Sequence, residues 1–253
     1  MRMPRTQFGA KVTQGGRPAV TLSIIVICVA VWLLQKVSPQ VTSELAFVPV
    51  LGVAEPWRFL TAAFAHSPGS PLHILFNMYA LWVLGQYLEP LLGRVRFAIL
   101  YLVCAFGGSV GYLLLVSPPA LPLTQDGVDS SSWIASVVGA SGAVFGLFGA
   151  LLVLNRHLGR SSGPMFGVLA INALLGFVVP GIAWQAHLGG VLTGVALAGV
   201  ITATAPQARR RLQLPALAAV FVLLGVCAGA KYAVTDDSIL RSIVSLGARI
   251  TSL

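Results

Sequence analysis

Residues 182–202 read IAWQAHLGGVLTGVALAGVIT. An α-helix rises 1.5 Å per residue, so this stretch would extend about 32 Å, enough to cross the hydrocarbon core of a bilayer. One imidazole, His187, stands in the run, and Gly190, Gly194 and Ala198 follow it on the same helical face. Small residues at this spacing let helix backbones approach closely in lipid. The stretch predicts a membrane helix whose small-residue stripe ends at a histidine.

The composition extends this prediction to the whole chain. Apolar residues make up 57% of the 253 residues and charged residues 9%, with a mean hydropathy of +0.87. Soluble domains carry about a quarter charged residues, so we expect an all-α polytopic membrane protein. Seven apolar segments can be drawn, and they are Ala19–Lys36, Leu72–Leu92, Phe97–Val116, Trp133–Leu154, Met165–Val179, Ile182–Thr202 and Leu214–Val234.

The charged residues predict the orientation of these segments. With a cytoplasmic N-terminus, eleven basic residues fall on the cytoplasmic side, namely Arg2, Arg5, Lys11, Arg17, Arg94, Arg96, Arg156, Arg160, Arg209, Arg210 and Arg211. Five fall outside, namely Lys36, Arg58, Lys231, Arg241 and Arg249. This positive-inside bias predicts seven spans with the N-terminus in and the C-terminus out. It also accounts for the net charge of +9 without nucleic-acid binding.

The same reading divides the chain into four parts. Residues 1–18 form a basic cytoplasmic segment leading into a signal anchor, and residues 19–204 form a six-helix core. Within the core, residues 38–71 are expected to form a partly ordered, interfacial outer loop, because they mix prolines with apolar stretches. Residues 205–234 hold a basic loop and the seventh helix, and residues 235–253 form an outer tail that is either a short amphipathic helix or disordered.

Polar side chains inside the spans are few and lie at one level. A polar group in lipid usually faces the bundle interior and has a function there. His73, Asn77, Ser141 and His187 all lie near the expected outer ends of their helices. Ser141 is flanked by Gly139, Ala140 and Gly142, a stretch that could begin a helix below the membrane surface, where free backbone N–H groups suit an oxyanion.

These residue types predict nucleophilic catalysis. Ser141 would be the nucleophile and His187 its base, brought together by a close contact between helices that carry Gly142, Gly146, Gly190 and Gly194. His73 and Asn77 stand one helical turn apart and would stabilise an oxyanion, although hydrogen bonding between helices also explains them. No carboxylate lies at this level, so a dyad is expected rather than a triad.

Other chemistries are disfavoured by the pattern. His66, His73 and His187 could meet, but no His-Glu-x-x-His motif and no intramembrane acid completes a metal site, so neither metal nor cofactor is expected. His66 and His157 are expected in loops without a role. The three cysteines, Cys28, Cys104 and Cys227, lie within apolar runs and predict packing groups rather than disulfides.

The motifs together resemble the rhomboid family of intramembrane serine proteases. They occur in family order as Trp57-Arg58, His73-Ile-Leu-Phe-Asn77, Glu89-x-x-x-Gly93-Arg94, Gly139-Ala-Ser141-Gly142 and Ala186-His187-x-x-Gly190-x-x-x-Gly194. The resemblance implies a Ser141–His187 dyad and an oxyanion hole from His73, Asn77 and the backbone N–H of Ser141. It also implies a ring at Phe145 that packs on the histidine, and a seventh helix added after the six-helix core.

An endopeptidase that cleaves transmembrane segments near the outer leaflet is the function that this resemblance implies. The alternative is a catalytically silent relative that binds membrane clients, which normally lacks the serine or the histidine. A transporter would need further ionisable residues at mid-membrane, and the last three core spans offer none deeper than His187. Transmembrane protein substrates are the expected partners, and a bacterial inner membrane is the expected location. Oligomeric state and natural substrate are not predicted.

Overall fold

The computed structural model describes residues 6–8, 17–119, 132–163, 167 and 181–235. This part of the chain is helical, apart from one isolated antiparallel bridge between Phe47 and Val137. Its elements are α1 (Ala19–Val37), α2 (Pro39–Leu45), η1 (Pro49–Leu51), α3 (Arg58–Thr61), α4 (Pro71–Leu92), α5 (Arg94–Leu115), α7 (Ser141–His157), α9 (Trp184–Ala203), η2 (Gln207–Leu212) and α10 (Gln213–Ala233).

Most of the predicted spans coincide with long helices. The first, second, third, sixth and seventh predicted segments match α1, α4, α5, α9 and α10 to within three residues at either end. The fifth predicted segment, Met165–Val179, lies outside the described residues except for Gly167, as does the predicted outer tail beyond Thr235. Among the described residues, four stretches are long and apolar enough to cross a membrane, and they are Ala19–Val37, Arg94–Leu115, Trp184–Ala203 and Gln207–Ala233.

The fourth predicted segment was wrong in its first eight residues. Helix α7 begins only at Ser141, and residues 132–140 form an irregular segment of turns and extended backbone with one bridge residue, Val137. The reason is tertiary, because this segment exchanges backbone hydrogen bonds with residues 38–71, the predicted outer loop. Val137 pairs with Phe47 through bonds of 2.8 and 2.9 Å, and Gly139 N–H donates to the carbonyl of Ala62 at 2.9 Å. The prediction that His157 lies in a loop was also wrong, since it is the last residue of α7.

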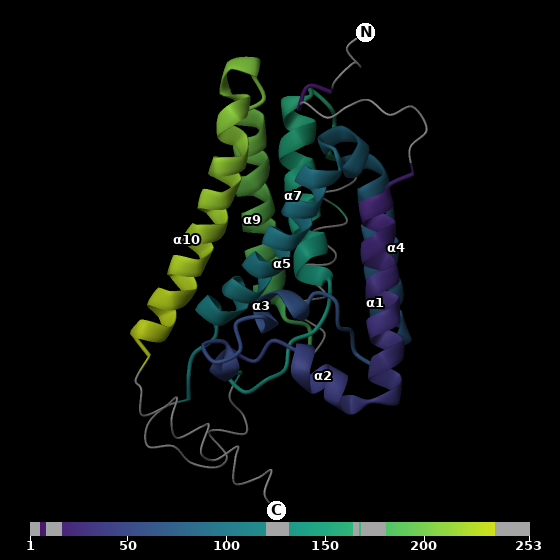
Figure 1. The fold of residues 1–253 in the computed structure, drawn as a ribbon, viewed down its shortest axis with the longest axis vertical. Coiled ribbons are helices and arrows are strands. Elements are labelled where there is room, and N and C mark those ends of the chain that lie inside the picture. Colours follow the sequence, from purple (N-terminus) through teal and green to yellow (C-terminus); the bar gives the residue numbers. More distant parts are fainter. Residues whose placement is uncertain (1–5, 9–16, 120–131, 164–166, 168–180, 236–253) are drawn as a thin grey trace, which may run out of the picture.

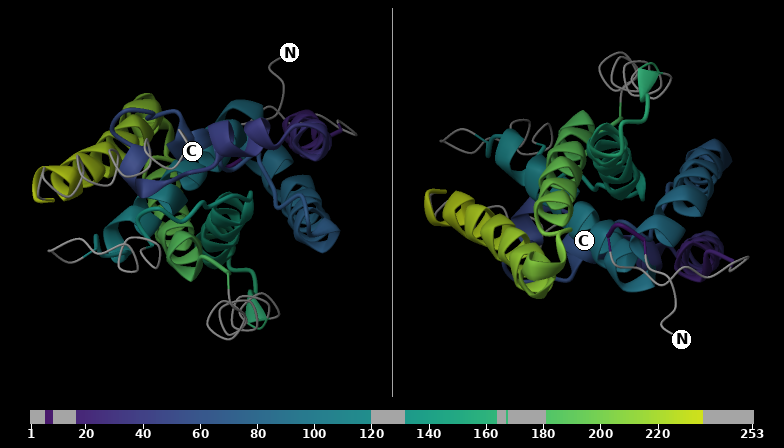
Figure 2. Two further views of the ribbon diagram at one scale, coloured as in Figure 1. Left: turned by 90° about the horizontal axis from the view of Figure 1, so that it is seen from below. Right: turned by 90° about the horizontal axis from the view of Figure 1, so that it is seen from above.

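Three helices form the centre of the molecule. Helices α5, α7 and α9 pack against one another, with α1 and α4 on one side and α10 on the other (Figures 1 and 2). Glycines make the central contact, because a Cβ added at Gly190 would overlap the carbonyl oxygen of Gly142, and one at Gly194 that of Gly146. The contact with α5 is looser, because a Cβ added at Gly108 would lie 3.2 Å from the Cα of Gly142. Backbones therefore meet directly where α7 crosses its neighbours.

A buried carboxylate joins α1 to α4. Glu89 is 3% exposed, and it accepts hydrogen bonds from the backbone N–H of Val20 (3.0 Å) and Thr21 (2.9 Å) and from Thr21 Oγ1 (2.7 Å). It thereby satisfies amides in the first turn of α1, where an anion also meets the positive end of the helix dipole. Four residues later, Gly93 has φ +83°, a conformation that favours glycine, and it turns the chain from α4 into α5. Arg94 is the exposed first residue of α5.

The outer loop is ordered around one arginine. Arg58 is 3% exposed, and its guanidinium donates to the carbonyl of Ala46 at 2.9 Å, to the carbonyl of Ser43 and to the Glu55 carboxylate. These bonds tie α2 to α3, as expected for a partly ordered segment. Trp57, the preceding residue, is 49% exposed, so its ring contributes little to this core.

Helix α10 is fixed at its first residue. Gln213 is buried, and its side-chain amide donates to the carbonyl of Ile201 (3.2 Å) and to Thr204 Oγ1 (3.0 Å), while its oxygen accepts from Arg96. The start of α10 is thus bonded to the end of α9 and to α5. Farther along, Phe221 packs on Phe106 of α5 with ring centroids 4.6 Å apart.

Candidate active site

Ser141 and His187 meet where α7 and α9 cross. The Oγ of Ser141 and the Nε2 of His187 form a hydrogen bond of 2.9 Å, although the residues lie 46 positions apart in the chain. Ser141 is the first residue of α7, so its side chain stands at the end of that helix where backbone N–H groups are unpaired within the helix. Both side chains are half-buried. The structure therefore brings the two predicted residues within reach of proton transfer.

The ring of His187 is held by an aromatic neighbour. Phe145 lies one turn after Ser141 on α7, and its ring stacks on the imidazole with centroids 4.2 Å apart and planes 9° apart. The Nδ1 of His187 has no hydrogen-bond partner among the described residues. Ring packing, rather than a carboxylate, thus orients the imidazole in this part of the structure.

His73 turns its Nε2 toward the same place. Its Nδ1 accepts a hydrogen bond from the backbone N–H of Ser67 (3.3 Å), so the neutral ring carries its proton on Nε2. A Cβ added at Gly139 would lie 2.8 Å from that Nε2 and 3.6 Å from Ser141 Oγ. The donor of His73 and the hydroxyl of Ser141 therefore border one small space, which the lack of a side chain at Gly139 leaves open. Gly139 also has φ +133°, a conformation that favours glycine.

Asn77 lies one turn after His73 on α4, and its predicted role as a second oxyanion donor stays a prediction. Its side chain is buried, and its Nδ2 donates to the carbonyl of His73, one turn earlier on α4, at 2.8 Å. One amide hydrogen is thus used within the helix, and the second stays available for another acceptor. Asn77 has direct contact with the backbone of His73 rather than with its ring.

His66 belongs to the site, although the sequence indicated no role for it. It is fully buried, its Nε2 accepts from the backbone N–H of Ala140 (3.4 Å), and its ring lies edge-on to His73 with centroids 5.3 Å apart. Its own backbone N–H donates to the side chain of Gln35 at the end of α1 (3.0 Å). Burial, with a smaller contribution from His73, lowers the pKa of His66 to about 4. A neutral ring therefore supports the residue that precedes Ser141.

The predicted glycines lie between the two halves of the site. Gly142 of α7 follows Ser141 in sequence, and it contacts Gly190 of α9, which lies three residues after His187. Gly146 and Gly194 make the same kind of contact one turn farther from the site. Gly146 also faces Cys104 of α5, so that a Cβ there would overlap the cysteine side chain. Because larger residues would separate α7 from α9, these glycines set the distance between the hydroxyl and the imidazole.

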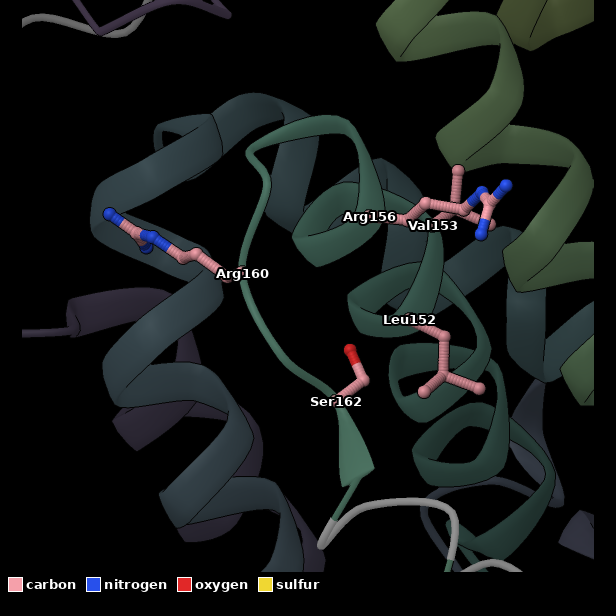
Figure 3. A pocket seen from close by; sticks show the side chains of 5 residues that line it. All are labelled: Leu152, Val153, Arg156, Arg160 and Ser162. Carbon is pink, nitrogen blue, oxygen red and sulfur yellow. The ribbon is translucent and has the colours of Figure 1, made fainter.

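A pocket lies at the far end of α7, away from this site. It is lined by Leu152, Val153, Arg156, Arg160 and Ser162. Figure 3 shows the two arginine side chains pointing away from each other. Arg160 reaches Tyr87 of α4, where it donates to the hydroxyl, so the arginines do not converge on one point. Within the described ranges, no three His, Cys, Asp or Glu side chains gather as a metal site.

Comparison with known proteins identifies the family of the chain. The family model of the Rhomboid domain matches residues 53–204, which is more than half of the chain. The chain belongs to the rhomboid family. The matched range includes His73, Ser141 and His187, together with the glycines between α7 and α9.

Similar rhomboid proteins occur in bacteria and plants. The chain is 29% identical to Rhomboid protease GluP of Bacillus subtilis (strain 168) over 197 residues, which cover 73% of this chain and 35% of GluP. It is 34% identical to the Putative rhomboid protease YdcA of the same organism over 154 residues, 58% of this chain and 69% of YdcA. It is 32% identical to RHOMBOID-like protein 6, mitochondrial, of Arabidopsis thaliana over 161 residues, 60% of this chain and 46% of that protein.

The coverage of these rhomboids is uneven. The chain spans 35% of the length of GluP and 46% of RHOMBOID-like protein 6, but 69% of YdcA. Family membership and the apolar helices make this rhomboid an integral membrane protein. Its bacterial location stays a prediction, because both bacterial and plant relatives are found.

Proposed function

We propose that this rhomboid is an intramembrane serine endopeptidase that cleaves transmembrane segments of other membrane proteins. The observation that carries the proposal is the 2.9 Å hydrogen bond between Ser141 Oγ and His187 Nε2. A serine hydroxyl is a weak nucleophile by itself, and a neighbouring base that takes its proton is the usual means of activating it. The stacked Phe145 ring supports the proposal because it fixes the imidazole in the orientation that this transfer needs.

The chemistry would proceed in two displacements. Ser141 Oγ attacks the carbonyl carbon of the scissile peptide bond, and its proton passes to His187 Nε2. The C–N bond then breaks, and the leaving amine takes the proton from His187. Water, deprotonated by the same imidazole, hydrolyses the ester on Ser141 and releases the carboxylate product.

Negative charge on the carbonyl oxygen needs donors close to Ser141. We assign this role to the Nε2–H of His73, the backbone N–H of Ser141 and the free amide hydrogen of Asn77. The first of these borders the open space beside Gly139. The start of α7 adds the positive end of a helix dipole at the same point.

The substrate would be an unwound part of a transmembrane helix. An intact helix uses its carbonyls in its own hydrogen bonds, so small or helix-breaking residues favour cleavage. Water must also reach the site, and this favours a site near one membrane face. With seven spans and the N-terminus inside, that face would be the outer one.

The test is cleavage of a model transmembrane substrate by the full chain in liposomes. Ser141→Ala and His187→Gln should each lower the cleavage rate by about 10³-fold or more, since members of such a unit contribute together. Ser117→Ala is the matched control, because Ser117 is exposed just beyond α5. Unchanged cleavage by Ser141→Ala would refute the proposal. A fluorophosphonate probe that fails to label the wild type would favour a client-binding relative instead.

A further inference from the structure

The outer end of α10 is attached to the loop that borders the site. Tyr232, in the last turn of α10, donates its hydroxyl hydrogen to the carbonyl of Pro49 at 2.7 Å. Its ring lies edge-on to Trp133, with centroids 6.0 Å apart and planes 77° apart. Trp133 is fully buried, and Tyr232 is half-buried. One side chain of the last helix thus contacts two segments that are far apart in sequence.

One of these segments, residues 132–140, ends at Ser141, and the other, the outer loop, is hydrogen-bonded to it. The backbone N–H of Val50 donates to the carbonyl of Trp133 (3.1 Å), and Phe47 pairs with Val137 through two backbone bonds. Gly139, two residues before Ser141, donates to Ala62 (2.9 Å). These bonds tie the irregular segment 132–140 to the outer loop, while Tyr112 and Trp133 tie its start to the end of α5. Tyr232 in turn holds the outer loop at Pro49.

The fit around the Tyr232 hydroxyl is close. A Cβ added at Gly52 would overlap this hydroxyl, and the next nearest atom, in the Phe59 ring, would be 2.9 Å away. Gly52 lies three residues after Pro49, so the loop closes over the tyrosine as well as accepting its hydrogen bond. This contact gives a second way to disturb the attachment without changing α10.

We propose that Tyr232 is a positioning residue, through which α10 holds the outer loop and segment 132–140 in the register that places Ser141 against His187. The inference rests on the proposed protease function for its catalytic consequence. Its structural consequence, a well-ordered segment 132–140, does not depend on that function. The seventh helix is then part of the active unit, rather than an addition to a six-helix core.

The experiment uses the full chain in detergent and compares Tyr232→Phe with Tyr79→Phe. The first removes only the hydroxyl, while the second changes a tyrosine on α4 that is 62% exposed. Loss of one buried hydrogen bond typically changes an equilibrium or rate constant by about fivefold. We expect Tyr232→Phe to lower the rate of fluorophosphonate labelling at Ser141 and kcat on a transmembrane substrate by about that factor, with KM nearly unchanged. Tyr79→Phe should stay within about twofold of the wild type in both rates.

Hydrogen exchange supplies a readout that needs no activity. The amides of Val137 and Gly139 should lose about fivefold of their protection in Tyr232→Phe and none in Tyr79→Phe. Gly52→Ala should act in the same direction as Tyr232→Phe. Wild-type labelling and wild-type protection in Tyr232→Phe would overturn the inference. A wild type that neither labels nor cleaves would overturn the protease proposal, while the exchange data would still decide the role of Tyr232.

Discussion

Helix α9 is part of the centre of the molecule and helix α10 packs against that centre, and the two helices make their contacts by different means. Helix α9 meets α7 through glycines whose backbones touch, as at Gly190 and Gly142. Helix α10 meets α5 through large side chains, such as Phe221 against Phe106. A contact between backbones has no side chain that can move aside, whereas a contact between rings can relax. The candidate site lies on the first kind of contact, and this suits a hydrogen bond that needs a fixed distance.

The largest expected effect comes from adding one methyl group to the α7–α9 contact. In Gly190→Ala the new Cβ would overlap the carbonyl oxygen of Gly142, so the helices must separate. A shift of about 1 Å can cost about 100-fold in rate, and overpacking of this kind costs roughly 1–3 kcal/mol of stability. Cleavage rate and thermal unfolding would measure both effects.

The control for this change is Gly199→Ala on the same helix. A Cβ at Gly199 meets nothing within 4 Å. This variant should cleave within about twofold of the wild type, because it adds a methyl group in open space. Equal activity of Gly190→Ala and Gly199→Ala would contradict the view that close backbone contact sets the Ser141–His187 distance.

A smaller effect is expected from the ring that orients the imidazole. Phe145→Ala removes the ring stacked on His187, so the imidazole gains freedom to turn away from Ser141. We expect kcat to fall by about tenfold with KM little changed, since stacked ring pairs contribute roughly 0.5–1.5 kcal/mol. Phe145→Tyr keeps the ring and should retain most activity. If Phe145→Ala and Phe145→Tyr lose activity equally, stacking is not what the site needs.

Loss of a ring on the α10 side should affect stability more than chemistry. Phe221→Ala removes the contact with Phe106, and about 1 kcal/mol of unfolding free energy should be lost. Probe labelling of the folded protein should change less than threefold, which corresponds to about 0.65 kcal/mol. Leu223→Ala, at a position 61% exposed on the same helix, is the control for both measurements. A tenfold fall in labelling for Phe221→Ala would show that α10 acts on the site along its whole length.

The last effect concerns pH and the buried His66. Burial lowers the pKa of His66 to about 4, whereas an unfolded histidine titrates near about 6.5. The unfolded chain therefore binds the extra proton first, and the stability due to neutral His66 is complete above pH about 6.5 and is lost as the pH falls toward about 4. Replacing His66 with glutamine should make the unfolding temperature fall less between those values. An unchanged pH slope in the glutamine variant would contradict this role of His66.

Prediction from sequence succeeded where local pattern controls structure. Apolar runs of about 20 residues located α1, α4, α5, α9 and α10, because lipid and core both select such runs whatever their neighbours are. The pairing of Ser141 with His187 was also accessible, because polar groups in apolar helices are few and the glycine stripes indicate which helices touch.

It failed where a distant segment competes with helix formation. Trp133 begins an apolar run that looks helical, yet Val137 and Gly139 form backbone bonds with residues 47 and 62, some 80 positions earlier. A similar separation along the chain explains why the role of His66 was missed, since its hydrogen-bond partner is the backbone of Ala140. The periodicity of a sequence does not indicate a hydrogen bond between two loops that lie far apart in the chain.

By itself, the sequence determined that the chain is a helical membrane protein with a serine, two histidines and an asparagine at the ends of apolar helices. Burial of apolar surface and the high cost of unpaired polar groups in lipid act on each segment separately, so these features can be read in order. Only the tertiary structure decided that α7 begins at Ser141, that His66 supports the preceding residue and that Tyr232 of α10 holds the outer loop. Each of these depends on atoms that come together only when the chain has folded.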